Sequence, residues 1–123
     1  MAEIKESVKA SRQKLLFICT ANISRSRTAE DILQNSPKYD VQSAGIEWHS
    51  RGGQMVSQGL INWADRIFVM EVRHLEHLYN CFCMEGKDKA VVFLDIPDNY
   101  GRGNPELIKL LISKLAEFGV VIS

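Results

Sequence analysis

Several features that would point to particular protein classes are missing from this sequence of 123 residues. The opening segment, Met-Ala-Glu-Ile-Lys-Glu-Ser-Val-Lys, carries charges throughout and lacks the apolar run of a signal peptide. No later run is long enough to cross a bilayer. Because 15 basic residues balance 15 acidic ones, bulk charge gives no support for nucleic-acid binding. We therefore expect a cytoplasmic protein that binds neither nucleic acid nor membranes.

Cysteine is also scarce, with three residues, an odd number. In the absence of an export signal we expect free thiols rather than a disulfide framework, so the reactivity of these thiols becomes the question. Apolar residues make up 46% of the chain and charged residues 24%, which is typical of a single globular domain. We expect a charged N-terminal arm over residues 1–13 and one domain over residues 14–123.

Apolar runs of strand length alternate with helical patterns along the domain. Strands are predicted for residues 15–18, 39–43, 66–70 and 90–94. Helices are predicted for residues 28–33, 56–64 and 73–79, and for a last amphipathic segment that Pro105 opens. This alternation predicts an α/β fold in which helices cover both faces of a parallel sheet.

The loop between the first predicted strand and the first predicted helix has the form C-x5-R-S, from Cys19 to Ser26. At such a junction backbone N–H groups can converge on an anion, and the helix dipole favours negative charge there. The same field favours the thiolate form of a cysteine, which makes Cys19 a candidate nucleophile. Arg25 is expected to curl back and bind two oxygens of a phosphoryl group through its planar guanidinium.

Two further residues of this loop have expected supporting roles. Asn22 tolerates a left-handed backbone and can hold the loop through side-chain hydrogen bonds, and the Ser26 hydroxyl can donate to the Cys19 sulfur.

The alternative for Cys19 is that it is a buried structural thiol, the usual fate of a free cysteine. The C-x5-R pattern alone is weak evidence, but its place between an apolar run and a helix favours the nucleophile.

The segment Leu-Phe-Ile-Cys-Thr-Ala-Asn-Ile-Ser-Arg-Ser resembles the signature loop of the low-molecular-weight protein tyrosine phosphatase family. The blocks at residues 43–45, 64–70 and 95–100 recur in the family's order, and the likeness is strongest to a short bacterial branch of predicted phosphatases. The resemblance implies a three-layer sandwich around a four-stranded parallel sheet. It also implies hydrolysis of phosphomonoesters through a phosphocysteine, with no metal and no cofactor.

The resemblance implies roles for individual residues as well. Asp98 matches the general acid and base of the family, with Asp95 as its competitor, and Trp48 and Tyr100 would line the rim of the site. The substrate would be a phosphorylated protein or a small phosphoester, and the oligomeric state is left open. The residues implied to bind the phosphoryl group are Thr20, Ala21, Asn22, Ile23, Ser24, Arg25 and Ser26.

Three positions depart from the family pattern. Ala21 replaces a glycine at a position that can require positive φ or a close backbone approach. Ser24 replaces a second cysteine, so the thiol that could trap an oxidised nucleophile as a disulfide is missing. Asn99 replaces a proline, which loosens the loop that carries the acid.

Three alternatives stay open. A thioredoxin-coupled arsenate reductase has a similar loop and would use Cys19 together with Cys81 and Cys83. A zinc site could use His74 and His77 with the same two downstream cysteines, although the pattern favours both histidines lying on the solvated face of a helix. A non-catalytic phosphate-binding module would keep the loop without turnover.

Overall fold

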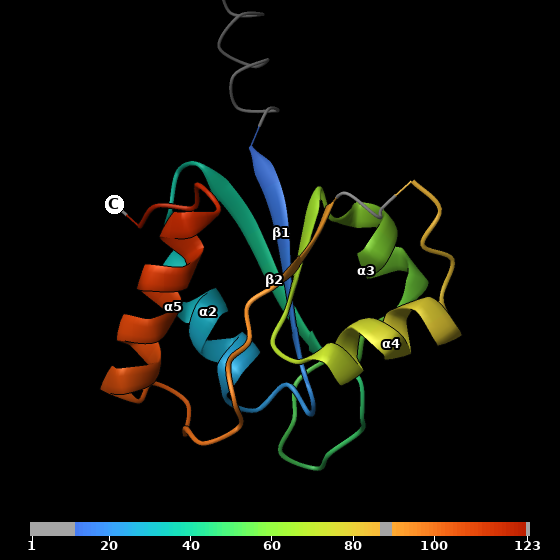
Figure 1. Cartoon of the computed structure of the whole chain (residues 1–123), viewed down its shortest axis with the longest axis horizontal. Helices are drawn as coiled ribbons and strands as arrows, with labels where there is room; N and C mark the ends of the chain where they lie inside the picture. Colours follow the sequence, from blue (N-terminus) through green and yellow to red (C-terminus); the bar gives the residue numbers. More distant parts are fainter. Residues whose placement is uncertain (1–11, 87–89, 123) are drawn as a thin grey trace, which may run out of the picture.

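The computed structural model of the chain describes residues 12–86 and 90–122 (Figure 1). Its elements follow in the order β1 (Gln13–Cys19), α2 (Arg25–Leu33), β2 (Tyr39–Gly45), α3 (Gln58–Trp63), β3 (Arg66–Val69), α4 (Val72–Cys81), β4 (Val91–Phe93) and α5 (Pro105–Glu117). The predicted alternation of strands and helices is confirmed. The charged arm predicted for residues 1–13 lies outside the described residues, apart from residues 12 and 13, and residue 13 begins β1.

The four strands form one parallel sheet in the order β2-β1-β3-β4, as the family resemblance implied. Strand β1 is therefore central, with Cys19 opposite Gly45 of β2 and Ile18 opposite Val69 of β3. Because all strands run the same way, their carboxyl ends share one edge of the sheet, where ligands of α/β proteins bind. Cys19 ends β1 at this edge.

Alternate residues of β1 face two different hydrophobic cores, as expected for a strand buried on both sides. Leu15, Phe17 and Cys19 belong to the core that α2 and α5 cover, whereas Leu16 and Ile18 belong to the core under α3 and α4. In Figure 1 the helices α2 and α5 lie on one side of the sheet, and α3 and α4 lie on the other. The predicted three-layer sandwich is confirmed.

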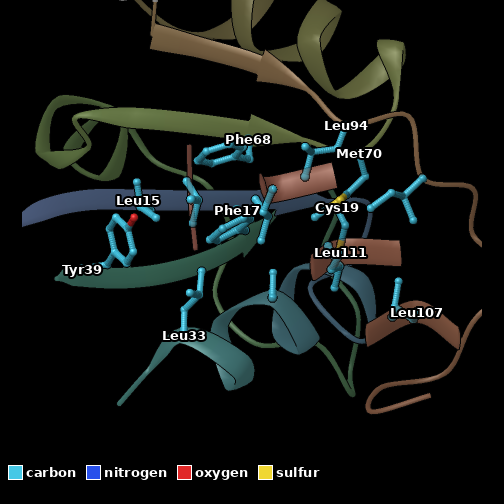
Figure 2. Packing of buried hydrophobic residues seen from close by; sticks show 14 residues of the cluster. Leu15, Phe17, Cys19, Leu33, Tyr39, Phe68, Met70, Leu94, Leu107 and Leu111 are labelled. Atoms are coloured by element: carbon cyan, nitrogen blue, oxygen red, sulfur yellow. The ribbon is translucent and has the colours of Figure 1, made fainter. Parts of the chain in front are cut away.

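The first core holds the cysteine end of β1 in place. Phe17 of β1 stacks on Phe68 of β3 with ring centroids 4.9 Å apart, and Figure 2 shows Leu107 and Leu111 of α5 on the same side of the sheet as Cys19. Each buried leucine contributes on the order of 2 kcal/mol.

Among the described helices none is long and apolar enough to cross a membrane.

Candidate active site

The C-x5-R loop lies where the sequence predicts it, between the end of β1 and the start of α2. Cys19 is 2% exposed and Arg25 is 1% exposed, so both chemically important side chains sit deep in the fold. A cavity opens over the loop, and Glu47, His49 and Asp98 complete its wall. The loop residues that line this cavity are Cys19, Thr20, Ala21, Ile23, Ser24 and Arg25.

The carbonyl groups of the loop are engaged by the segment that follows β2. The oxygens of Cys19, Thr20 and Asn22 accept backbone hydrogen bonds from residues in the range 46–53, at N–O distances of 3.1, 2.8 and 3.1 Å. In a planar trans peptide the N–H points opposite to the carbonyl. The N–H groups that follow these three carbonyls therefore point away from segment 46–53, which suits them to binding an anion.

Two glycines let this segment lie directly against the loop. A Cβ atom at Gly45 would lie 2.7 Å from the carbonyl carbon of Ala21 and 2.7 Å from the amide nitrogen of Asn22. A Cβ atom at Gly52 would overlap the carbonyl oxygen of Ala21. In the described residues the non-glycine positions with positive φ are Asn22 (54°) and Asp95 (56°), so the methyl group of Ala21 causes no left-handed strain.

The sulfur of Cys19 is held by a short chain of buried polar groups. Its Sγ lies 2.9 Å from the Oγ atom of Ser26, and Asn22 donates through Nδ2 to the same Oγ at 2.7 Å. Both contacts agree with the expected supporting roles of Asn22 and Ser26. A thiolate carries no hydrogen, so in that state Ser26 must be the donor, and its hydrogen bond stabilises the negative charge.

Both terminal nitrogens of the Arg25 guanidinium donate hydrogen bonds, whereas its Nε donates none. Its Nη1 donates to Glu71 Oε2 at 2.6 Å and to the Ile96 carbonyl at 2.8 Å, and its Nη2 donates to Thr20 Oγ1 at 3.2 Å. Its Nε is 3.7 Å from Asp98 Oδ1 and is the one buried side-chain nitrogen or oxygen of the described residues without a hydrogen-bond partner. This buried donor fits a phosphoryl oxygen.

Glu71, which sequence reasoning did not single out, anchors Arg25 and also caps α4. Its side chain accepts from the backbone of His74, while His74 Nδ1 accepts from the Glu71 N–H at 3.0 Å, a reciprocal capping box. Burial alone would raise the pKa of Glu71, but the hydrogen bond and charge of Arg25, followed by the charge of Arg73, outweigh it and lower that pKa. Glu71 therefore stays ionised beside Arg25.

The prediction that His74 lies on a solvated helix face is wrong. Its side chain is 0% exposed: Nδ1 takes part in the capping box at the start of α4, and the ring contacts the phosphate-binding loop. Its Nε2 lies 3.1 Å from Thr20 Oγ1. Burial, and then the charge of Arg25, lower the pKa of His74 from 6.5 to about 4, so the ring is neutral at pH 7.

This placement separates the four side chains of the alternative zinc site. His74 faces the loop, whereas His77 Nδ1 lies 3.9 Å from the Sγ of exposed Cys81. Nowhere in the described ranges do three or more histidine, cysteine, aspartate or glutamate side chains gather in a way that could hold a metal ion. The four-ligand arrangement considered from the sequence is not formed.

The same geometry disfavours a disulfide relay. Cys81 ends α4 and lies seven residues after His74, which corresponds to roughly 10 Å along a helix axis. Cys81 and Cys83 are both exposed, while Cys19 is buried beneath the cavity. The two downstream thiols are therefore not placed to exchange a disulfide with Cys19 in this conformation.

The predicted acid and rim residues lie in different settings. Asp98 lines the cavity and is 59% exposed, whereas Asp95 does not line it and presents its carbonyl to Lys114. Trp48 is 75% exposed and is not itself a lining residue. Tyr100 is half-buried against the core under α2 and α5 and does not line the cavity.

Arg73 is another residue that sequence reasoning did not single out. Its Nη2 donates to Thr20 Oγ1 at 2.5 Å, and its Nη1 lies 3.6 Å from Glu47, which lines the cavity. The available signal was the Glu-x-x-His spacing at the start of a predicted helix, which is the spacing of a capping box. That spacing predicts how the first turn of α4 is capped. It does not predict that this turn contacts the phosphate-binding loop.

A buried cysteine at a strand end, an arginine six residues later at a helix start and a loop suited to an anion between them are features of cysteine-dependent phosphatases. The model of the family described as low molecular weight phosphotyrosine protein phosphatase matches residues 14–57, which include the whole loop. The resemblance expected from the sequence is therefore confirmed. The chain shares the fold of these phosphatases, and its residues 14–57, with the phosphate-binding loop, are similar to this family.

Solved structures of such phosphatases share the fold at low sequence identity. The YwlE arginine phosphatase of Geobacillus stearothermophilus is 23% identical, with a TM-score of 0.67 over 86% of this chain and 92% of that one. Vibrio vulnificus Wzb, in complex with benzylphosphonate, is 24% identical, with a TM-score of 0.67 over 87% and 97%. The tyrosine phosphatase Wzb of Escherichia coli K30, in complex with phosphate, is 23% identical, with a TM-score of 0.67 over 87% and 96%. A search of curated protein sequences finds no significant match.

Proposed function

We propose that this protein hydrolyses the phosphomonoester of a phosphorylated protein or of a small molecule through a phosphocysteine on Cys19. The observation that carries the proposal is the pairing of two buried groups over one cavity. These are the sulfur of Cys19, within hydrogen-bonding distance of Ser26, and the Nε donor of Arg25, which has no hydrogen-bond partner. Phosphoryl transfer requires a nucleophile, here the Cys19 sulfur, and a cation with an unused hydrogen-bond donor, here Arg25.

In the first step the Cys19 thiolate attacks phosphorus. An S–P bond forms, the P–O bond to the leaving group breaks, and Asp98 gives its proton to the departing oxygen. Charge on the equatorial oxygens is stabilised by Arg25 and by loop N–H groups. Asp98 suits this role by its position, because it lines the cavity that Cys19 and Arg25 also line.

In the second step a water molecule attacks the phosphorus of the phosphocysteine. Asp98, now a carboxylate, takes a proton from this water, the S–P bond breaks, and inorganic phosphate leaves with the Cys19 thiolate restored. The hydrogen bond from Ser26 stabilises the thiolate both as nucleophile and as leaving group. Because Cys19 must be a thiolate while Asp98 is still protonated, we expect a bell-shaped dependence of kcat/KM on pH.

The proposal is tested by metal-free hydrolysis of p-nitrophenyl phosphate in the presence of a chelator. Cys19→Ser should lose turnover by at least about a thousandfold, because serine is a far weaker nucleophile at neutral pH, yet still bind inorganic phosphate. The matched control is Cys83→Ser, an exposed thiol outside the cavity, which should retain wild-type turnover.

Each outcome separates the candidate functions. Turnover that survives Cys19→Ser would contradict the phosphocysteine. Phosphate binding without wild-type turnover would favour the non-catalytic module. Loss of turnover in Cys83→Ser would favour a redox role for the downstream thiols.

A further inference from the structure

We infer that His74 is a positioning residue of the phosphate-binding site, which acts through Thr20 to hold the guanidinium of Arg25. His74 is not among the residues that line the cavity, so it cannot contact a phosphoryl group itself. The inference deepens the proposed function, on which it rests, by adding a residue from α4 to the machinery of the loop.

The two ring nitrogens of His74 have distinct partners, and these define its tautomer. Nδ1 lies 3.0 Å from the backbone nitrogen of Glu71 and accepts its N–H. In a neutral imidazole whose Nδ1 accepts, the hydrogen must be on Nε2. Nε2 is 3.1 Å from Thr20 Oγ1, so His74 is the donor in that contact.

Thr20 is the junction through which this donor reaches the site. Its Oγ1 also lies 3.2 Å from Arg25 Nη2 and 2.5 Å from Arg73 Nη2. Three N–H groups therefore converge on a hydroxyl oxygen that has two lone pairs, which they share, and Thr20 has its own O–H left to offer. Because Thr20 lines the cavity, that hydrogen is available to a phosphoryl oxygen beside Arg25.

Arg25 is held in one plane by contacts on two sides. Glu71 Oε2 and the Ile96 carbonyl hold Nη1, while Thr20 holds Nη2. When both terminal nitrogens of a planar guanidinium are held, the direction of its Nε–H is determined as well, and in Arg25 this N–H has no hydrogen-bond partner. If the Thr20 side chain were free to rotate, Arg25 Nη2 would lose its hydrogen-bond acceptor. The guanidinium would then no longer be held in line with the cavity.

A neutral imidazole suits this position better than a cation. Glu71, Arg25, Arg73 and His77 are the charged and titratable groups that act on His74, and the two arginines oppose its protonation. A neutral Nε2–H donates to Thr20 without adding a positive charge beside Arg25. The competing explanation is that His74 only caps α4 and fills space.

Two substitutions separate positioning from capping. In His74→Gln the side-chain amide can extend to the place of Nε2 and donate to Thr20. In His74→Asn the shorter amide can still accept from the Glu71 N–H, as Nδ1 does, but cannot reach Thr20. Thr20→Val removes the junction hydroxyl and keeps the shape of the side chain.

The experiment is calorimetric titration with inorganic phosphate at about pH 7, together with kcat/KM for p-nitrophenyl phosphate, on these variants. His74→Asn should weaken phosphate binding about fivefold to tenfold, the worth of one hydrogen bond, and His74→Gln should recover most of that loss. In the double variant of His74→Asn and Thr20→Val, phosphate binding should match that of Thr20→Val within about twofold, since residues acting through one contact are not additive.

Several results would overturn the inference. These are phosphate binding by His74→Asn equal to the wild type, equal losses in the two histidine variants, or additive losses in the double variant. If His74→Asn fails to fold, His74→Met, which fills the space but cannot donate, takes its place. A wild type that binds phosphate but shows no turnover contradicts the proposed function and leaves this test intact, whereas a wild type that does not bind phosphate contradicts both.

Discussion

The Oγ atom of Ser26 lies 2.9 Å from the Sγ atom of Cys19, and both groups are buried. Asn22 is a donor to the same oxygen, at 2.7 Å, from a left-handed backbone position. Ser26 thus has a partner that orients its hydroxyl toward the sulfur. The nucleophile of the proposed reaction is supported from behind the loop, on the side away from substrate.

We predict that Ser26→Ala slows alkylation of Cys19 by iodoacetamide at pH 7 about tenfold, because a charge-assisted hydrogen bond to the thiolate is lost. Mass spectrometry measures the modification of each cysteine. Cys83, exposed and remote from Ser26, is an internal reference whose rate should not change. Equal rates at Cys19 in both proteins would contradict a role for this hydroxyl.

Asp98→Asn should reduce kcat more with phenyl phosphate, a poor leaving group, than with p-nitrophenyl phosphate. Loss of a general acid costs about a hundredfold or more when the departing oxygen needs a proton. Asp95→Asn is the matched control, because asparagine tolerates the positive φ of 56° and Asp95 does not line the cavity. The assignment would be reversed if Asp95→Asn showed the leaving-group dependence instead.

Gly45→Ala should destabilise the protein by about 1 to 3 kcal/mol, because its Cβ would lie 2.7 Å from the backbone of the phosphate-binding loop, which cannot yield without moving. Gly59→Ala is the control: its Cβ would meet Ser57 Oγ at an ordinary 3.7 Å, and alanine is the better helix former in α3. Urea unfolding gives both free energies. A Gly45→Ala protein as stable as the wild type would show that the end of β2 is not in close contact with the phosphate-binding loop.

The buried, neutral state of His74 predicts a specific loss of stability in acid. An unfolded histidine takes up its proton near pH 6.5, whereas His74 in the fold does so only near its pKa of about 4. Between these values the unfolded chain binds the extra proton, so the free energy of unfolding falls as the pH falls.

From about pH 7 to about pH 4.5 the wild type should therefore lose roughly 2 kcal/mol more than His74→Gln. Urea titrations at both pH values measure this difference, and the carboxylates common to both proteins cancel in it. Parallel losses in the two proteins would mean that His74 is not held neutral by the fold.

Much of the fold could be predicted because its signals are local. The apolar run at residues 15–18 identifies the central strand, and Pro105 followed by Leu107, Leu111 and Leu115 identifies the last helix. The C-x5-R loop could be placed for the same reason, since a loop between a strand and the following helix lies at the carboxyl edge of the parallel sheet in an α/β fold.

The partners of the loop could not be predicted in this way. Glu71 and His74 lie about 50 residues from the loop and meet it only because β3 pairs with β1, which brings the start of α4 to the same sheet edge. The solvated interpretation of His74 failed for this reason. A helical pattern gives the spacing of residues on a helix, but it does not say which neighbouring segment the first turn will contact.

The sequence by itself determined the layered parallel fold, the nucleophile candidate Cys19 and its partner Arg25, because strand and helix periodicity and a contiguous loop are encoded by neighbours along the chain. Only the tertiary structure decided that Asp98 rather than Asp95 lines the cavity, and that a glutamate and a neutral histidine stand behind the loop. Those relationships depend on where parallel strands end relative to one another, and on burial, which alters the charge state of a side chain only once the sheet has assembled.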